Sequence, residues 1–204
     1  MAEYRLNKSE LTRLQRELTI YGQYLPVLKL KKEQLQSEHG RLKRAYLAQK
    51  EKVAQLKTWA EGFVALLAEP LPFDVVTLVR PLHTEISERV VAGVRVPHLE
   101  EVQFSNFVPP RFGSPAWLSR ALPELRRLAE ENLRGAVMEQ QYHAVDRELR
   151  KTTQKVNLFE KVLVPRTREA IKRIRITLGD RQVASVCRAK IAKSKKQQLE
   201  ETAS

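Results

Sequence analysis

Apolar residues in the first third of the chain recur at alternating spacings of three and four residues. Fourteen of seventeen positions in this series are apolar, and most of the intervening residues are Lys, Arg, Glu or Gln. The series is Leu11, Leu14, Leu18, Tyr21, Leu25, Leu28, Lys32, Leu35, His39, Leu42, Tyr46, Gln49, Val53, Leu56, Ala60, Phe63 and Leu67. Such a seam keeps one stripe of a helix against a partner helix in a left-handed coiled coil. The pattern predicts one long helix over 8–68, with Asn7 and Ser9 as candidate N-caps.

A second series of the same kind runs through the last third of the chain. It consists of Met138, Tyr142, Val145, Leu149, Thr152, Val156, Phe159, Leu163, Thr167, Ile171, Ile174 and Leu178. One extra step of four residues, through Thr167, interrupts the alternation close to Pro165. Such a slip is a stutter, which locally unwinds a coiled coil. The pattern predicts a second long helix with a local irregularity near Pro165.

The two predicted helices are expected to pair with each other as an antiparallel hairpin. If the pair closes near Leu67 and Leu122, the numbers of facing residues add to about 190. This register sets Pro26 level with Pro165, where both helices would bend. It also predicts an ion pair between Lys31 or Lys32 and Glu160.

The middle of the chain has a different composition. Eight of the ten prolines lie between residues 70 and 123, and proline disrupts helix interiors. The β-branched runs Val75–Val79 and Val90–Val96 predict short strands. With Trp117 and three phenylalanines, these runs suggest a small cap over the open end of the hairpin. The segment Phe104–Pro115 reads as an irregular loop, and both a docking surface and a plain connector remain open for it.

These patterns together predict a mainly α protein. Its centre is a long antiparallel two-helix coiled coil formed by the N- and C-terminal arms, with a small mixed middle segment of short strands and helix. The predicted segments are an N-terminal arm over 1–68, a middle segment over 69–121 with a possible β-hairpin, a C-terminal arm over 122–196 and a disordered tail over 197–204.

Charge at first points to a nucleic-acid partner, because the 204 residues carry a formal net charge of +13. Resolved along the chain, however, residues 1–60, 61–120 and 121–204 carry +7, −2 and +8. The positive charges are spread over both arms and interleaved with Glu, which is not typical of a DNA-binding basic region. The single cysteine excludes an internal disulfide framework and fits a reducing compartment. No apolar run approaches the roughly 20 residues of a membrane span, and the N-terminus lacks the apolar core of a secretory signal.

Motifs for catalysis are missing from the sequence. There is no phosphate-binding glycine loop and no zinc-binding H-E-x-x-H, and the four histidines lack metal-ligand spacing. We therefore expect no catalytic residue, no metal site and no bound cofactor. His39 lies on the seam and is interpreted as a partly buried structural residue. Cys187 lies beside Arg188, which would favour a reactive thiolate, but its spacing favours a packed small apolar residue.

The densest positive cluster follows Cys187. Its candidate contact residues are Arg188, Lys190 and Lys193. Such a cluster can contact phosphates or an acidic protein wall. It can equally be the solvated end of a helix, which is the commoner role of such a run.

The block KVNLFEKVLVP over 155–165, with Thr167, Ile171, Ile174 and Leu178 after it, resembles the signature of the D subunit of V-type ATPases. The matching positions include Asn157, Glu160 and Pro165. Two further segments match in family order: LKLKKEQL over 28–35, and VAGVRVP over 91–97 with Gly93 and Pro97. The resemblance covers roughly residues 10–196. Departures at Leu158 and over 178–182 suggest a divergent bacterial member.

This resemblance implies a central rotor shaft, non-catalytic by itself, that transmits torque between an ATP-hydrolysing or ATP-synthesising head and a membrane ion-translocating ring. The implied partners are the catalytic and regulatory head subunits, the F subunit and the membrane-side socket subunit above the ring, with no direct binding of nucleotide or nucleic acid. The implied location is cytoplasmic, peripheral to the membrane through the complex. The alternative is a basic coiled-coil scaffold that binds nucleic acid, which would be a homodimer rather than an intramolecular hairpin.

Overall fold

The computed structural model describes residues 4–63, 74–108, 110 and 114–202, with the backbone alone for 197–202. The chain forms two compact units. Unit 1 consists of 1–30 with 153–204, and unit 2 of 31–152. The elements in chain order are α1 (Lys8–Glu61), α3 (Val75–Val79), β1 (His83–Val91), β2 (Val94–Gln103), α4 (Ala116–Leu158), the π-helix η1 (Phe159–Leu163) and α5 (Val164–Thr202). The protein is therefore mainly α, with one two-stranded sheet, as the sequence predicts.

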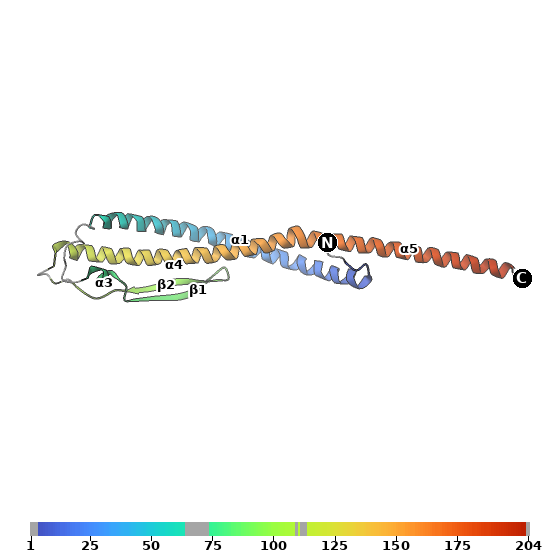
Figure 1. Ribbon diagram of the computed structural model, residues 1–204, viewed down its shortest axis with the longest axis horizontal. Coiled ribbons are helices and arrows are strands. Elements are labelled where there is room, and N and C mark those ends of the chain that lie inside the picture. Colours follow the sequence, from blue (N-terminus) through green and yellow to red (C-terminus); the bar gives the residue numbers. More distant parts are fainter. Residues whose placement is uncertain (1–3, 64–73, 109, 111–113, 203–204) are drawn as a thin grey trace. The chain divides into compact units, whose positions relative to one another are not determined.

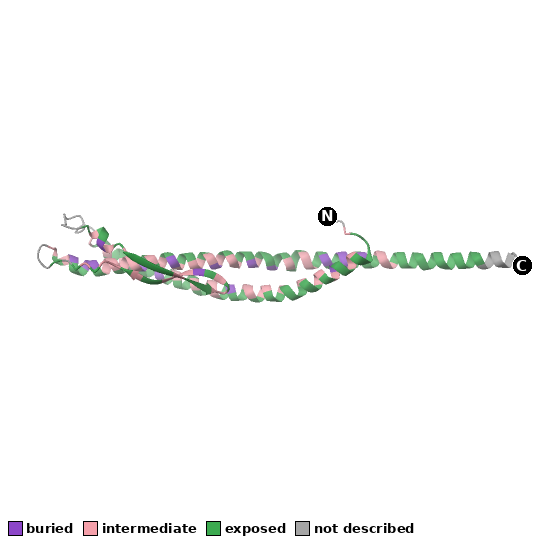
Figure 2. Cartoon of the chain, turned by 90° about the horizontal axis from the view of Figure 1, so that it is seen from below, coloured by how far each residue is buried: buried purple, intermediate pink, exposed green. Residues whose placement is uncertain are grey.

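Helix α1 follows the predicted seam closely. Every position of the seam series from Leu11 to Phe63 is buried or half-buried, whereas most residues between them are exposed. Figure 2 shows this recurrence of buried and half-buried residues along the helices. Asn7 is the N-cap, because its Oδ1 accepts a hydrogen bond of 2.8 Å from the backbone N–H of Glu10. The predicted helix and one of its candidate caps are thus confirmed, although the helix ends at Glu61 and not at residue 68.

The predicted irregularity near Pro165 is a π-helical turn. Elements α4, η1 and α5 follow one another without a break, since the residues flanking η1 keep right-handed helical dihedral angles. The N–H of Val164 donates to the carbonyl of Phe159, five residues back. Pro165 lacks an N–H, and its ring would crowd the carbonyl four residues earlier in a regular α-helix. A wider turn before the proline relieves this clash and accounts for the extra step in the seam.

Unit 1 is held together by an apolar core between the start of α1 and α5. Leu14, Ala170, Ile171 and Ile174 are buried together, and Tyr4, Leu11, Leu18 and Leu178 pack around them. Further along the pair, Tyr21 of α1 meets Phe159 edge to face, with the ring centroids 5.3 Å apart. Residue numbers rise on α1 as they fall on the partner, so the pairing is antiparallel.

Unit 2 combines α1, α4 and the β-hairpin around a second core. Leu35, Val96 and Val145 are buried together, one from each of these three parts. The residues at the tip of the hairpin, Val91 to Val94, pack against this same cluster. The hairpin therefore lies along the side of the helix pair, as Figure 1 shows for β1, β2 and α4. The predicted cap over the open end is wrong in this respect, because the apolar face of β2 is buried against the helices.

The hairpin turns at two residues with positive φ. Strands β1 and β2 pair antiparallel from Val91↔Val94 to His83↔Gln103, with an irregularity between Glu85 and Ile86. Ala92 and Gly93 have φ values of 48° and 77°. This is the geometry of a tight two-residue hairpin turn, which glycine adopts without strain. The predicted β-structure over Val90–Val96 is confirmed. These residues form not one strand but the end of β1, the turn and the start of β2.

The first predicted strand, Val75–Val79, is wrong. These residues form the short helix α3, whose N-cap Asp74 accepts a hydrogen bond of 2.9 Å from the N–H of Val76. Capping by Asp74 outweighs the β-propensity of the valines. At the other end of the chain, α5 continues to Thr202, so the predicted disordered tail over 197–204 is helical as far as that residue. The predicted boundary at residue 68 lies outside the described residues, and the division into arms stays a prediction.

Candidate functional site

The exposed part of α5 is the main candidate surface of unit 1. Arg181 donates a 2.8 Å hydrogen bond to the carbonyl of Leu6, and this contact lies at the start of the N-terminal segment. Beyond it, every residue from Asp180 to Lys196 is exposed. Three large apolar residues, Val183, Val186 and Ile191, are among them. A helix that exposes both apolar and basic side chains is typical of a binding surface.

The three predicted contact residues all lie on this exposed stretch. A helix turns about 100° per residue, so Lys190 and Lys193 are about 60° apart and share a face. Arg188 lies about 160° from Lys190, and its Nε donates a 3.2 Å hydrogen bond to the carbonyl of Ala184. The structure therefore puts the three cations on one helix but not on one face.

Cys187 is exposed on the same stretch. The prediction that Cys187 packs like a small apolar residue is therefore wrong, as far as contacts with the rest of this chain are concerned. The apolar seam that packs against α1 has its last packed member at Leu178, before the cysteine. Spacing alone did not reveal that the partner helix is absent there.

The family-signature block surrounds the π-helical turn. Asn157 and Pro165 are exposed, and Glu160 binds Lys29 with an Nζ–Oε1 distance of 2.8 Å. Tyr21 and Lys29 of α1 both contact this block, so Pro26 between them lies level with the start of η1. The prediction that Pro26 and Pro165 share one level is therefore wrong by several residues.

The predicted ion pair needs the same correction. Glu160 binds Lys29, and Lys31 binds Glu148 with an Nζ–Oε1 distance of 2.9 Å. The structure therefore gives Lys31 a different partner from the predicted Glu160, since the numbers of this facing pair add to 179 and not to about 190. Lys32 lies half-buried on the seam.

Unit 2 contains a buried polar network that the sequence reasoning missed. Gln49 occupies a seam position, and its Nε2 donates to Glu131 Oε2 at 2.7 Å and to the Glu131 carbonyl at 2.9 Å. Lys52 forms a short contact with the other carboxylate oxygen. Burial alone would raise the pKa of Glu131, but the hydrogen bonds from Lys52 and Gln49 outweigh it and the pKa lies below its ordinary value. A polar residue on an apolar seam was the signal that could have revealed this network.

His39 is half-buried on the seam, as predicted. Its Nε2 lies 3.3 Å from Asp146 Oδ1, and its ring contacts Tyr142 with the centroids 4.9 Å apart. The signature residues of the middle also have structural positions: Gly93 forms the hairpin turn, and the Pro97 carbonyl accepts a 2.6 Å hydrogen bond from Gln141. These contacts join the hairpin and α1 to α4.

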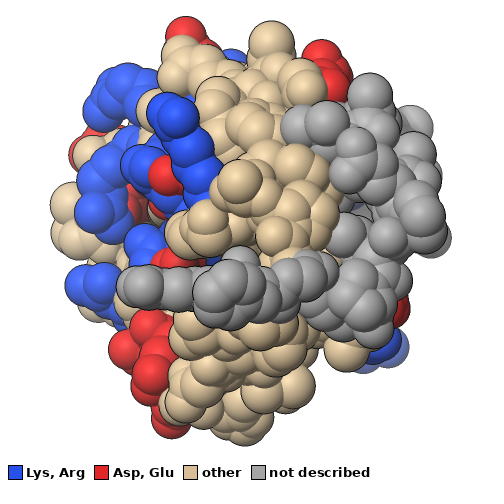
Figure 3. Space-filling view, turned by 90° about the vertical axis from the view of Figure 1, so that its left-hand side faces the viewer, with Lys and Arg blue, Asp and Glu red and all other residues tan. Residues whose placement is uncertain are grey.

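A second candidate surface lies where the hairpin meets the start of α4. Arg126 holds this corner together, since its Nε donates to the carbonyl of Leu78 at 3.1 Å. Beside it is a groove of about 540 Å³, lined by Phe104, Phe107, Val108, Ser119, Leu122, Pro123, Arg126, Arg127 and Glu130. In the end-on view of Figure 3, uncharged residues fill the centre of the face and Lys and Arg gather at one side.

Neither unit presents a metal centre in its described residues, because no group of three or more His, Cys, Asp or Glu side chains is placed to hold an ion. The described helices also include none with the length and apolar character needed to cross a bilayer. The described surface offers basic and apolar side chains on α5, and an apolar groove between the segment after β2 and the start of α4.

Fold and surface together define an antiparallel coiled-coil protein with a side hairpin and an exposed basic terminal helix. Residues 10–194 match the family model of the ATP synthase D subunit, so the chain belongs to this family. The V-type ATP synthase D subunit of Borreliella burgdorferi is 32% identical to it over 195 residues, covering 95% of each chain. The corresponding protein of Chlamydia muridarum is 30% identical over 203 residues, covering 98% of this chain and 99% of the relative.

Proposed function

We propose that this chain is the central rotor shaft of a V-type rotary ATPase. In this role it transmits torque between the ATP-hydrolysing or ATP-synthesising head and the membrane ion-translocating ring. The observation that carries the proposal is the exposed, basic continuation of α5 past its last contact with the N-terminal segment, in a chain of the ATP synthase D-subunit family. Such a helix has the form and charge to enter a collar of other subunits.

The pairing of the helices supports a torque-bearing role. Torque can pass along a helix pair only if the two helices resist sliding and twisting past each other. In unit 1 this resistance comes from the interlocked apolar core around Leu14 and Ile174. In unit 2 it comes from the apolar core around Leu35 and Val145 together with cross-helix polar contacts such as Lys31–Glu148 and Lys52–Glu131.

The shaft itself is proposed to be non-catalytic, with the nucleotide held by the catalytic and regulatory head subunits. A kinked, asymmetric shaft would present a different face to each catalytic interface of the head. Rotation would then bias each interface between open and closed states through differential contacts. Arg188, Lys190 and Lys193 are proposed to face acidic or polar walls of this head.

The remaining partners are assigned to unit 2. We propose that the F subunit and the membrane-side socket subunit above the ring bind around the hairpin and the start of α4. The apolar groove with Phe104, Phe107 and the exposed Val108 supports this assignment, because exposed apolar residues in a groove are typical of a binding surface. The protein would then be cytoplasmic and peripheral to the membrane through the assembled complex.

The alternative of a nucleic-acid-binding scaffold receives less support. A zipper-type scaffold needs an apolar seam that is free for a second copy. Here the described seam positions of α1 are buried or half-buried, and the cores of both units form within one chain. No second copy is needed to cover them.

A truncation tests the proposal. Removing 188–204 from the chain in the reconstituted ATPase should reduce ATP-driven ion transport severalfold while part of the ATP hydrolysis by the head persists. Removing only 201–204 is the matched control and should leave transport unchanged. Equal transport by the two truncated complexes would contradict the proposed role of the α5 extension.

A further inference from the structure

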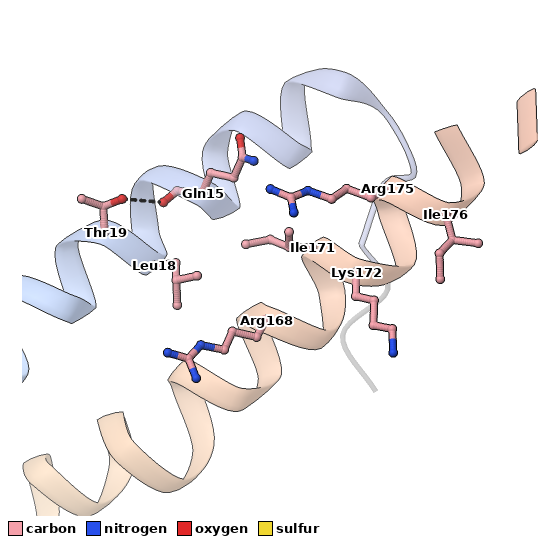
Figure 4. A pocket seen from close by; sticks show the side chains of 8 residues that line it. All are labelled: Gln15, Leu18, Thr19, Arg168, Ile171, Lys172, Arg175 and Ile176. Atoms are coloured by element: carbon pink, nitrogen blue, oxygen red, sulfur yellow. Dashed lines mark hydrogen bonds between the residues drawn. The ribbon is translucent and has the colours of Figure 1, made fainter. Parts of the chain in front are cut away.

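Unit 1 contains a groove between α1 and α5 that the proposed shaft function leaves unassigned. Its volume is about 530 Å³. It is lined by Gln15, Leu18 and Thr19 of α1 and by Arg168, Ile171, Lys172, Arg175 and Ile176 of α5. Figure 4 shows these eight side chains on the two helices.

Three cations of α5 border this groove. Arg168, Lys172 and Arg175 are exposed, and none of them has a hydrogen-bond or ion-pair partner among the described residues. Their spacing of four and then three residues puts them on one face of the helix. At 1.5 Å per residue, the row is about 10 Å long. The groove therefore carries a line of cations without neutralising groups.

Apart from the side-chain amide of Gln15, the rest of the groove is apolar or has its polar group hydrogen-bonded. Ile171 is buried, Leu18 is half-buried, and Ile176 adds an exposed apolar side chain. Thr19 Oγ1 donates a 3.1 Å hydrogen bond to the Gln15 carbonyl, as the dashed line in Figure 4 indicates. A ligand that fills this groove must therefore combine negative charges at the cations with an apolar group at Leu18 and Ile171.

We propose that the groove binds an acidic segment of a partner protein, with carboxylates on Arg168, Lys172 and Arg175 and a large apolar side chain over Leu18 and Ile171. The row of about 10 Å is longer than a compact anion such as phosphate, which would contact all three cations only if their side chains converged. Three residues of an extended peptide span about 10 Å, so spaced carboxylates match the row. A nucleic-acid backbone would supply negative charges but would leave the apolar residues Leu18 and Ile171 uncovered.

This inference deepens the proposed function, on which it rests for the identity of the partner. In a rotary ATPase the acidic segment would belong to the head that surrounds α5. The groove would give the shaft a second contact with the head, besides the basic α5 extension. In this contact an apolar side chain of the partner fixes its position and the carboxylates fix its orientation.

Two arginine pairs on α5 offer a matched comparison. The double variant R168E/R175E reverses two charges that line the groove. The control R166E/R173E reverses two exposed arginines with the same seven-residue spacing, which do not line it. Position 166 is about 200° from position 168 on the helix, so the control changes the net charge equally on another face. Circular dichroism melting curves establish that both variants fold like the parent chain.

The first measurement is the affinity of the full chain for the reconstituted head. R168E/R175E should weaken binding about tenfold and flatten its dependence on salt, whereas R166E/R173E should weaken it less than about threefold. Equal weakening by both variants, or none by the groove variant, would overturn the groove inference. If the parent chain does not bind the head at all, the proposed function fails.

The second measurement does not depend on the head. A fluorescent 12-residue peptide with alternating Glu and Leu is titrated with each full-length variant, beside its Gln counterpart and an oligonucleotide duplex of equal charge. The groove variant should lose affinity for the Glu peptide selectively. A larger loss for the duplex, or no preference for Glu over Gln by the parent chain, would overturn the groove inference whatever the result with the head.

Discussion

The two units of the chain stabilise their helix pairs in different ways. In unit 1 the buried contacts between α1 and α5 are apolar, and the cross-helix ion pair Lys29–Glu160 is exposed, with side-chain exposures of 45% and 46%. In unit 2 the corresponding pair Lys52–Glu131 has its carboxylate buried, at 9% exposure, and a hairpin adds a third layer. The comparison teaches that one periodic seam supports both an apolar and a polar form of helix pairing.

The largest effect is expected from the apolar core of unit 1. Replacing the buried Ile174 by Ala should lower the free energy of unfolding by about 3 kcal/mol, because it leaves a cavity beside Leu14. The control Ile176→Ala, at a position 55% exposed, should cost less than about 0.5 kcal/mol. Urea denaturation measures both values, and hydrogen exchange should locate the loss of protection in unit 1. Similar losses in the two variants would contradict the assigned core.

The second-largest effect is expected from the ion pair Lys52–Glu131 of unit 2, in comparison with Lys29–Glu160 of unit 1. Lys52→Ala should destabilise the protein by about 1.5–2 kcal/mol, because it removes a partner from a buried carboxylate. Lys29→Ala should cost about 0.5 kcal/mol or less, because its pair is exposed and screened by solvent. The measurement is again urea denaturation. If Lys29→Ala proves the costlier change, the contrast between the units is wrong.

The Glu131 network also predicts a dependence on pH. Its pKa in the folded state is lowered, so its contribution to stability is present above the unfolded value of about 4.3 and is lost as pH falls through the folded pKa. Glu131→Gln should therefore be less stable than the parent chain at neutral pH, and this difference should shrink as the solution is acidified below the unfolded pKa. Glu33→Gln, an exposed change on α1, is the control for lost charge. A difference that stays constant over this range would contradict the role of the buried carboxylate.

The smallest effect is expected at the hairpin, which only unit 2 possesses. Gly93 has a φ of 77°, and a Cβ added there would meet no atom within 4 Å. Gly93→Ala should therefore cost about 1 kcal/mol through backbone strain alone. Ala92→Gly, at a φ of 48°, should stabilise the turn by a similar or smaller amount. Thermal melting of the two variants measures both, and a shift of the same sign in the two would contradict the strain argument.

The sequence predicted the helices better than their register. Burial of the seam and a local irregularity near Pro165 could be predicted because both follow from local spacing, although its form as a π-helical turn could not. Register could not, because a repeating seam fits its partner almost equally well after a shift of one or two turns. Individual contacts such as Lys31–Glu148 decide between these alternatives, and spacing does not encode them.

The surfaces were only partly predictable for a similar reason. The basic stretch after Cys187 is visible as composition, but its exposure depends on where the partner helix begins. The row Arg168, Lys172 and Arg175 has helical spacing in the sequence, yet the groove beside it also needs Gln15, Leu18 and Thr19 of α1, which only the fold brings there. Likewise, Asp74 could be recognised as a cap only once α3 was known to be helical.

The π-helical turn has a consequence for anyone who aligns or redesigns this chain. One additional residue in the turn offsets the angular phase of everything after it by about 100° relative to an uninterrupted α-helix. A heptad register extended across 159–163 would therefore assign the residues of α5 to the wrong faces. Deleting a single residue between Phe159 and Leu163 would keep the helix continuous but rotate all of α5 about its axis. Its apolar seam would then no longer face Leu14.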